Sequence, residues 1–220
     1  MLSPLTEDNV VPDATLPPLL EARDLGCRRN EVLLFAGLGF SLDAGEILQI
    51  DGANGSGKTS LLRILCGLAQ AEQGEVLWCG QPMQGDRGAY LADLAYVAHA
   101  NGVKGELTAL ENLAVAAALC TKTSSRSLEE TLGETGLLNH ADLPAANLSS
   151  GQRRRLALAR LLVSAARLWI LDEPFTALDE GGKRIVKDMI TRHSKNGGTV
   201  ILTTHESIDW QQQILKKVNL

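Results

Sequence analysis

Apolar positions along the chain form short continuous runs and longer stretches with the spacing of a helix. The short runs predict β-strands at residues 46–50, 75–78, 94–98, 167–172 and 198–205. The last two are almost continuously apolar, which is typical of strands buried on both faces of a parallel sheet. Helix spacing follows the first run, with apolar side chains at Leu61, Ile64, Leu65 and Leu68. Strands that alternate with helices predict an α/β fold with a mainly parallel central sheet.

A longer block interrupts this alternation. Residues 108 to 138 are rich in Ala, Leu and Glu and are predicted to be largely helical. Thr108 and Glu111 fit a capping box, so a helix is expected to begin at Thr108. We therefore expect an inserted helical sub-domain at about residues 100–155, preceded by a hinge loop from His99 to Leu107.

The first eighteen residues have a different composition. They contain Pro4, Pro12, Pro17 and Pro18, no Lys or Arg, and no continuous apolar segment. These residues lack the basic start and apolar middle of a signal peptide. We expect a disordered extension at residues 1–18, with docking on a partner as the alternative, and one folded domain at residues 19–220.

Overall composition narrows the class of protein. The chain has 220 residues, of which 45% are hydrophobic and 21% charged, and its net charge is −5. These proportions are ordinary for a globular protein, and the acidic balance argues against broad nucleic-acid binding. No apolar stretch reaches the ~18 residues that a membrane span needs. A role at a membrane would therefore depend on a partner.

The cysteines do not predict a metal centre. Cys27, Cys66, Cys79 and Cys120 form no CxxC pair and no CxxCH haem-attachment motif. We expect reduced, mostly buried thiols, as in a cytosolic protein.

The stretch "GANGSGKT" fits the pattern G-x-x-x-x-G-K-[ST] completely. Its glycines let the backbone curl, so that successive N–H groups point at phosphate oxygens. Lys58 supplies a positive charge for the β- and γ-phosphates, and the Thr59 hydroxyl is a ligand for Mg²⁺. A predicted strand precedes the motif and a predicted helix follows it, as nucleotide binding requires. The residues expected to bind the nucleotide are Gly52, Ala53, Asn54, Gly55, Ser56, Gly57, Lys58, Thr59 and Ser60.

A pair of carboxylates ends the apolar run "LWILDEP". Asp172, at the end of a buried strand beside a phosphate loop, can hold Mg²⁺. Glu173 points the other way if the chain stays extended, and it can then orient or deprotonate an attacking water. Ordinary turn residues before Pro174 are the alternative.

The stretch "LSSGQRRRLALARLLV" predicts a helix with apolar Leu156, Ala159, Leu162 and Val163. Ser149 and Gly151 at its start offer a hydroxyl and N–H groups to an anion, and a plain N-cap is the alternative. The charges at positions 153–155 (Arg153, Arg154 and Arg155) are interpreted as helix-face charges rather than phosphate ligands.

These motifs occur in one order along the chain: "GANGSGKT", "LSSGQ", "LWILDEP", "ALD" at Ala177–Asp179, and "TTH" ending at His205. In that order and spacing they resemble the nucleotide-binding domain of ABC ATPases, over roughly residues 19 to 205. The resemblance implies a P-loop NTPase fold of the ABC ATPase type.

The resemblance also implies a role for each matching residue. Lys58 and Thr59 would bind ATP and Mg²⁺, and Asp172 would help to hold the Mg²⁺. Glu173 would be the general base, and His205 would contact the γ-phosphate and the attacking water. Ser149, Gly151 and Gln152 belong to the motif that reaches the ATP of an opposite subunit, so the chain is expected to pair with a second copy of itself.

Two departures from the family pattern stand out. Ser150 takes the place of a glycine in the usual Leu-Ser-Gly-Gly-Gln, while Ser149 and Gly151 remain. The family stacks the adenine on an aromatic side chain upstream of the phosphate loop, and here no aromatic precedes Phe35. We expect loose selectivity for adenine, with Arg28 or Arg29 as a substitute platform.

The stretch "YVAH" puts His99 where these ATPases usually carry a glutamine that contacts the nucleotide site. Together with "NGVKGELTALENL", "LQIDGANGSGKTSLLRILCGL" and "WILDEPFTALD", it resembles the ATP-binding subunits of cytochrome c maturation, also called haem exporter, systems. A base at His99 is redundant beside Glu173 and His205. We therefore interpret His99 as part of a linker between the ATP site and a membrane partner.

This second resemblance implies partners and a location. The partners would be integral membrane proteins resembling CcmB and CcmC, and ATP hydrolysis would drive release of haem-loaded chaperone CcmE. The protein would lie peripherally on the cytoplasmic face of the bacterial inner membrane and would bind no nucleic acid. Other possibilities are the ATP-binding subunit of a different small ABC exporter, or a soluble ABC ATPase acting on DNA or ribosomes. The segment between Lys58 and Leu148 has no room for the long coiled coil of the DNA-repair relatives.

Overall fold

The computed structural model describes residues 17–206, 208–210 and 214–220. Residues 1–16 of the extension expected at residues 1–18 therefore lie outside the described residues.

The central sheet is parallel throughout, as predicted. Its strand order is β6–β7–β8–β3–β9, and all its neighbours run parallel. The strands are β6 (Leu94–Val97), β7 (Leu168–Asp172), β8 (Thr199–Thr203), β3 (Ile47–Asp51) and β9 (Leu215–Asn219).

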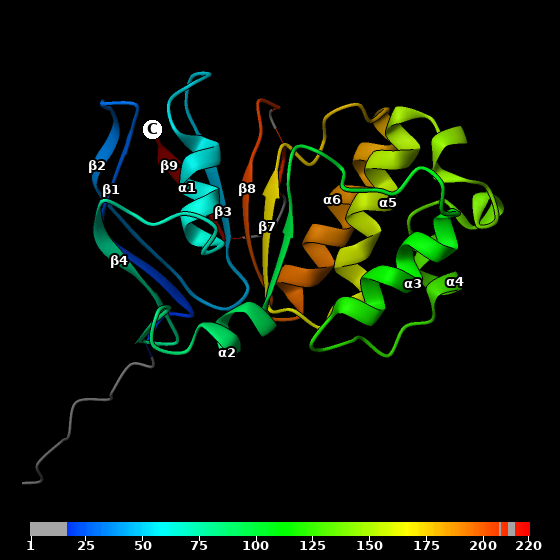
Figure 1. Ribbon diagram of the computed structural model, residues 1–220, viewed down its shortest axis with the longest axis horizontal. Helices are drawn as coiled ribbons and strands as arrows, with labels where there is room; N and C mark the ends of the chain where they lie inside the picture. The colour runs from blue at the N-terminus through cyan, green and yellow to red at the C-terminus, as the bar shows by residue number, and fades with distance from the viewer. Residues whose placement is uncertain (1–16, 207, 211–213) are drawn as a thin grey trace, which may run out of the picture.

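Alternate side chains of the central strands enter two different cores. On β7, Ile170 packs on one face with α1 (Lys58–Leu65), while Trp169 and Leu171 pack on the other. On that second face lie α5 (Ser150–Val163) and α6 (Glu180–Lys195) (Figure 1). Both faces are buried, which explains why the strands read as continuous apolar runs.

A second sheet is antiparallel, and the sequence predicts only one of its strands, at residues 75–78. It has the order β2–β1–β4–β5 and lies on the far side of α1 from the central sheet (Figure 1). Repeated register shifts interrupt the pairing of its two longest strands, so period-two alternation is weak there. The strands are β1 (Leu20–Arg29), β2 (Val32–Leu42), β4 (Gln73–Trp78) and β5 (Gln81–Pro82).

Helix α1 is shorter than its apolar spacing predicts. Leu61, Ile64 and Leu65 are buried as expected. The helix ends at Leu65, because Gly67 adopts a left-handed conformation with φ 66° and terminates it. Leu68 therefore lies beyond the helix and is 56% exposed.

The helical block packs along α5. Helix α3 (Ala109–Leu119) begins with the predicted capping box between Thr108 and Glu111, which the structure confirms. The prediction of a largely helical segment at 108–138 is confirmed, with a break at residues 120–127, where the chain forms a bridge with α5's C-terminal end. The remaining helical elements are α2 (Arg87–Ala92), α4 (Leu128–Glu134), η1 (Leu138–His140) and η2 (Ala145–Asn147).

A separate apolar cluster joins α3, α4 and α5, with Leu113, Leu132 and Leu156 fully buried in it. The expected boundaries of a helical sub-domain at about 100–155 remain a prediction. Among the described residues, no helix combines the length and the apolar character needed to cross a bilayer.

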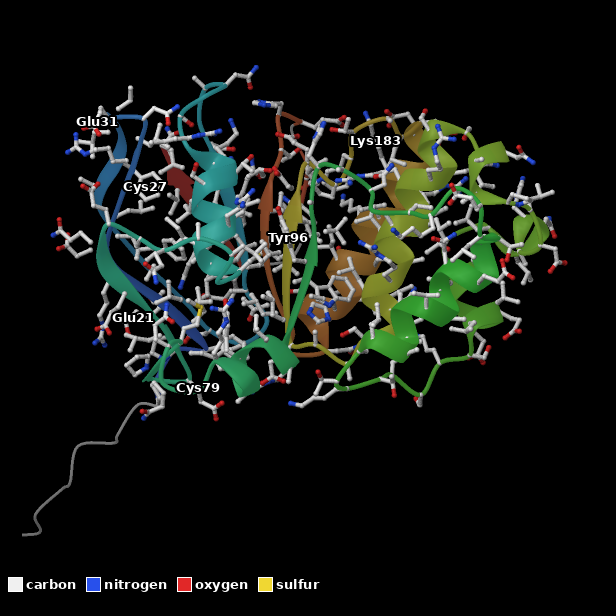
Figure 2. All side chains as sticks on the ribbon, in the orientation of Figure 1. Glu21, Cys27, Glu31, Cys79, Tyr96 and Lys183 are labelled. Carbon is white, nitrogen blue, oxygen red and sulfur yellow. The ribbon has the colours of Figure 1, made fainter. Side chains whose placement is uncertain are left out.

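All four cysteines are free thiols. Cys27 and Cys66 are buried, but Cys79 is exposed and Cys120 partly so, which corrects the expectation of mostly buried thiols. Burial raises the pKa of Cys66 to about 12, so this thiol stays protonated at neutral pH. Figure 2 shows Cys27 and Cys79 far apart on the antiparallel sheet, and no group of three or more potential metal ligands gathers within the described part of the chain.

Candidate functional site

A cavity with a volume of about 600 Å³ lies at the carboxyl edge of the central sheet. Loops that follow β3, β6, β7 and β8 all contribute to its lining. Because parallel strands end at one edge, this is where an α/β sheet brings distant polar side chains together.

The phosphate loop forms one wall of the cavity. Gly57, the residue before α1, has φ 109°, and a Cβ there would lie 3.1 Å from Leu34 Cβ and 3.2 Å from the Phe35 ring. Gly55 has φ 86° and lines the cavity, with nothing within 4 Å of the place of its Cβ. The loop therefore needs glycine for its conformation, and it leaves space where a ligand would approach.

Two polar side chains of this loop have the chemistry to donate to an anion. Lys58 Nζ donates to the carbonyl oxygens of Gly52 and Ala53, at 2.7 and 3.0 Å, and forms no ion pair among the described residues. Ser56 Oγ is buried, and no hydrogen-bond partner for it lies in residues 17–206, 208–210 and 214–220. An anion beside the loop would satisfy both groups.

Of the residues predicted to bind the nucleotide, those lining the cavity are Asn54, Gly55, Gly57, Lys58, Thr59 and Ser60. Gly52, Ala53 and Ser56 belong to the same loop but do not line the cavity.

Asp172 ends β7 and is only 4% exposed. Its carboxylate accepts hydrogen bonds from two hydroxyls, Thr59 Oγ1 at 3.2 Å and Thr203 Oγ1 at 2.8 Å. The phosphate loop and two strand ends thus converge on one buried carboxylate. An anionic group held only by neutral donors is a favourable place for a cation.

Glu173 does not continue the strand, which corrects the prediction of an extended chain at this residue. Its φ is 50°, because the backbone turns immediately after Asp172, and its N–H donates to Thr203 Oγ1 at 3.0 Å. The turn carries the side chain into the cavity wall, where Oε1 is buried and accepts no hydrogen bond from the residues that the structure describes. This oxygen lies 3.4 Å from Nε2 of His205, which also lines the cavity.

His99 lines the same cavity from the loop after β6. This loop is connected to the turn at Glu173 by Arg154. The prediction that Arg154 is a helix-face charge is wrong, because its side chain is only 3% exposed. Burial lowers the pKa of its guanidinium, against the opposite effect of the Asp172 and Glu173 carboxylates.

The motif at the start of α5 is not brought to this cavity. Ser149 Oγ accepts from Gln152 N at 3.1 Å, and Gln152 Oε1 accepts from Ser149 N at 2.7 Å, which completes a capping box. A Cβ on Gly151 would lie 2.9 Å from the carbonyl oxygen of Ala177. None of these three signature residues lines the cavity, and the starts of α1 and α5 lie apart in Figure 1.

The β1–β2 hairpin contributes part of the cavity lining. Asn30 and Glu31 form its two-residue turn, with φ 47° and 63°, and Figure 2 places Glu31 at the tip. Arg29 pairs directly with Val32, so both side chains share a face, and both line the cavity together with Leu34. The sequence left Arg28 and Arg29 as alternatives, and the structure places only Arg29 in the lining.

Comparisons with known proteins agree with this arrangement. The model of the family described as "ABC transporter" matches residues 35–176. The curated protein "Cytochrome c biogenesis ATP-binding export protein CcmA" of Escherichia coli K12 is 46% identical over 202 residues, which are 92% of this chain and 96% of that relative. The protein of the same name from Vibrio cholerae is 45% identical over 203 residues, which are 92% of this chain and 98% of that relative.

The chain belongs to the ABC transporter family. Within it, the chain groups with the CcmA proteins, and as a family member it is a nucleotide-binding, ATP-hydrolysing enzyme. A solved structure of a putative ABC transporter ATP-binding protein from Pyrococcus furiosus superposes with a TM-score of 0.78 at 25% identity, covering 91% of this chain and 96% of the other. The predicted fold class is therefore confirmed.

Proposed function

We propose that this chain is the ATP-hydrolysing subunit of a bacterial ABC-type complex for cytochrome c biogenesis. In this complex, hydrolysis drives haem handling, or release of a haem-loaded chaperone, through integral membrane partners. The observation that carries the proposal is the 46% identity to CcmA over 92% of this chain and 96% of the relative. Because the alignment takes in nearly all of both chains, the likeness is not limited to motifs that ABC ATPases share.

The phosphate loop supports ATP binding at the cavity. Backbone N–H groups at the start of α1 and the ammonium of Lys58 would hold the phosphates, and the uncapped N-terminal end of α1 adds a favourable dipole. The buried Ser56 hydroxyl, which has no hydrogen-bond partner in the described part of the chain, has the chemistry to join them.

The oxygen donors at Asp172 fit Mg²⁺. A carboxylate and a threonine hydroxyl, 3.2 Å apart, are hard ligands of the kind that this ion prefers. Thr59 Oγ1 and an Asp172 oxygen would hold it. When bound, the ion supplies positive charge that neutralises the phosphate oxygens during cleavage.

Glu173 and His205 are proposed as the hydrolytic residues. The Glu173 carboxylate, with its buried oxygen free of hydrogen bonds, would take a proton from the attacking water as the new P–O bond forms and the bond to ADP breaks. His205, 3.4 Å away and exposed, would orient this water and contact the γ-phosphate. Among the described residues Arg154 donates to backbone oxygens and to Asn101 Oδ1 and forms no ion pair with a carboxylate, so it takes no part in the proton transfer.

We propose that two copies of the chain pair, so that Ser149, Gly151 and Gln152 of one copy face the ATP of the other. The separation of α5's start from the cavity within one chain supports this arrangement. The pair would lie on the cytoplasmic face of the inner membrane, against partners resembling CcmB and CcmC, with CcmE as the chaperone acted upon.

The deciding experiment is a pull-down of the tagged chain from detergent-solubilised membranes of a bacterium that matures c-type cytochromes. We expect integral proteins resembling CcmB and CcmC, and the haem chaperone, to be captured. Glu173→Gln is the matched variant: it should capture the same partners while cytochrome c maturation and ATP turnover fail together. A chain that stays soluble beside those membranes and purifies with nucleic acid would contradict the proposal.

A further inference from the structure

Arg154 is the only one of three consecutive arginines in α5 to be fully buried. Arg153 and Arg155 are partly exposed and bond to residues of the helical block: Arg155 Nη1 donates to Thr135 O at 2.8 Å, and Arg153 Nη1 donates to Leu148 O. A buried guanidinium costs several kcal/mol unless its donors are satisfied. The contacts of Arg154 are therefore informative.

Its donors meet two separate segments of chain. On one side, Nη2 donates to the carbonyl oxygens of Asp172 at 2.6 Å and Glu173 at 2.8 Å, and Nε reaches Pro174 O at 3.4 Å. On the other side, Nη1 donates to Ala98 O at 2.9 Å and to Asn101 Oδ1 at 3.1 Å. No carboxylate forms an ion pair with it among the described residues, so carbonyl and amide dipoles compensate the charge.

These two segments follow neighbouring strands. Val97 pairs with Leu171, so the chain leaves β6 and β7 side by side. The first segment carries His99, and the second carries Glu173 in its left-handed turn. Both of these side chains line the cavity, whereas Arg154 does not.

We propose that Arg154 is a positioning residue that holds the His99 loop and the Glu173 turn in one arrangement and links both to α5. This inference rests on the proposed hydrolytic function. Only the guanidinium fork, with donors in one plane, reaches both segments together; a lysine ammonium or a glutamine amide lacks that geometry. Since α5 is one continuous helix from Ser149's cap to Val163, a shift at its start would move both cavity segments.

The test compares Arg154→Gln with Arg155→Gln in the full-length purified chain. Both variants lose one positive charge from the same helix, but the bonds of Arg155 go to Thr135 rather than to the site. We expect Arg154→Gln to lower kcat by about tenfold or more, with the Kd for ATP within about threefold of the parent. Arg155→Gln should stay within about twofold in kcat.

A second readout does not depend on hydrolysis. The rate of hydrogen exchange of backbone amides, measured without nucleotide, should rise in Arg154→Gln at both 98–101 and 172–176. In Arg155→Gln it should rise in neither segment. Free guanidinium at millimolar concentration should restore part of the kcat of Arg154→Ala. Unchanged kcat, equal losses of kcat and ATP affinity, or faster exchange in one segment alone would overturn the inference.

If Arg154→Gln does not fold, Asn101→Ala removes one acceptor while leaving the guanidinium in place. We expect it to lower kcat by about twofold to fivefold and to raise exchange at 172–176, which Asn101 does not itself contact. Parent-like exchange there would overturn the inference. Persistent turnover in Glu173→Gln, with the exchange results as expected, would instead contradict the proposed function and leave the positioning role intact.

Discussion

Helices α1 and α5 both begin at a motif, but they begin in different ways. The N-cap of α1 is Gly57, in a left-handed conformation and with no side-chain cap. The N-cap of α5 is Ser149, which forms a complete capping box with Gln152. The N–H groups at the start of α1 therefore point into the cavity without a side chain to accept from them, whereas α5 satisfies part of its own start.

The start of α1 thus leaves backbone N–H groups available to an anion, whereas the start of α5 is stabilised by its own capping side chains. At α5, Ser149 Oγ is used as an acceptor, and no described hydrogen bond uses the hydroxyl as a donor. The remaining donor is what Ser149 can offer to a phosphate of a second copy. The comparison thus predicts that mutations at the two helix starts have different consequences.

The largest effect is expected at α1. Lys58→Ala should weaken ATP binding by about 100-fold or more, because the phosphates lose a charge-assisted donor. Titration calorimetry with ATP measures this, and Lys195→Ala, at an exposed position at the end of α6, is the charge-matched control. Parent-like affinity in Lys58→Ala would remove the distinction between the two helix starts.

At α5, Ser149→Ala should leave ATP affinity of a single chain near that of the parent. It should lower the free energy of unfolding by about 1 kcal/mol through loss of the cap. It should also lower turnover about tenfold through loss of the donor to the second copy. Urea unfolding and ATPase rates measure the two effects.

Ser127→Ala is the control for that experiment, because Ser127 forms the same capping box with Glu130 at the start of α4. Ser127→Ala should lower the free energy of unfolding by a similar ~1 kcal/mol, with no loss of ATP turnover. Equal turnover losses in both variants would mean that Ser149 acts only as a cap.

Two glycines sharpen the comparison for stability. Gly57→Ala should lower the free energy of unfolding by about 1–3 kcal/mol, since φ is 109° and the new Cβ meets Leu34 and Phe35. Gly133→Ala, in α4 with nothing within 4 Å, should raise it by roughly 0.5–1 kcal/mol. Urea unfolding without nucleotide measures both, and a neutral Gly57→Ala would mean that the loop does not need its left-handed residue.

The smallest effect is expected at the hairpin. Arg29→Ala should weaken binding of ATP and GTP alike, by about twofold to fivefold, because a guanidinium plane contacts a base without reading its edges. Arg28→Ala is the control, since Arg28 is directed to Glu72 at 3.3 Å. Competition between fluorescent ATP and GTP analogues measures both, and a strong preference for one base would contradict loose selectivity.

The sequence predicts those parts of the site that depend on local signals. The phosphate loop needs glycines at fixed spacing, and Asp172 ends an apolar run, so both are visible in the sequence. The same holds for the buried face of α5, where Leu156, Ala159 and Leu162 recur at helix spacing. These features are set by neighbours in the chain.

Other parts depend on contacts between distant residues. In the sequence, Arg154 cannot be distinguished from the two arginines beside it. It can be buried because backbone carbonyl oxygens at the ends of β6 and β7 accept its hydrogen bonds. Glu173 adopts a left-handed backbone conformation at its turn, and the sequence has no glycine there that would predict it. Within the antiparallel sheet, β4 is predicted, whereas β1 and β2 are not, because register shifts obscure their alternation.

The pairing of β3 with β8 has a consequence for synthesis of the chain. Strand β3 leads directly into the phosphate loop, yet its neighbour β8 lies near the other end of the sequence, at Thr199–Thr203. At about 5–20 residues per second, translation separates the two strands by on the order of ten seconds. Until β8 emerges, the loop has no completed sheet behind it, so a nascent chain becomes competent for nucleotide only after β8 has been synthesised.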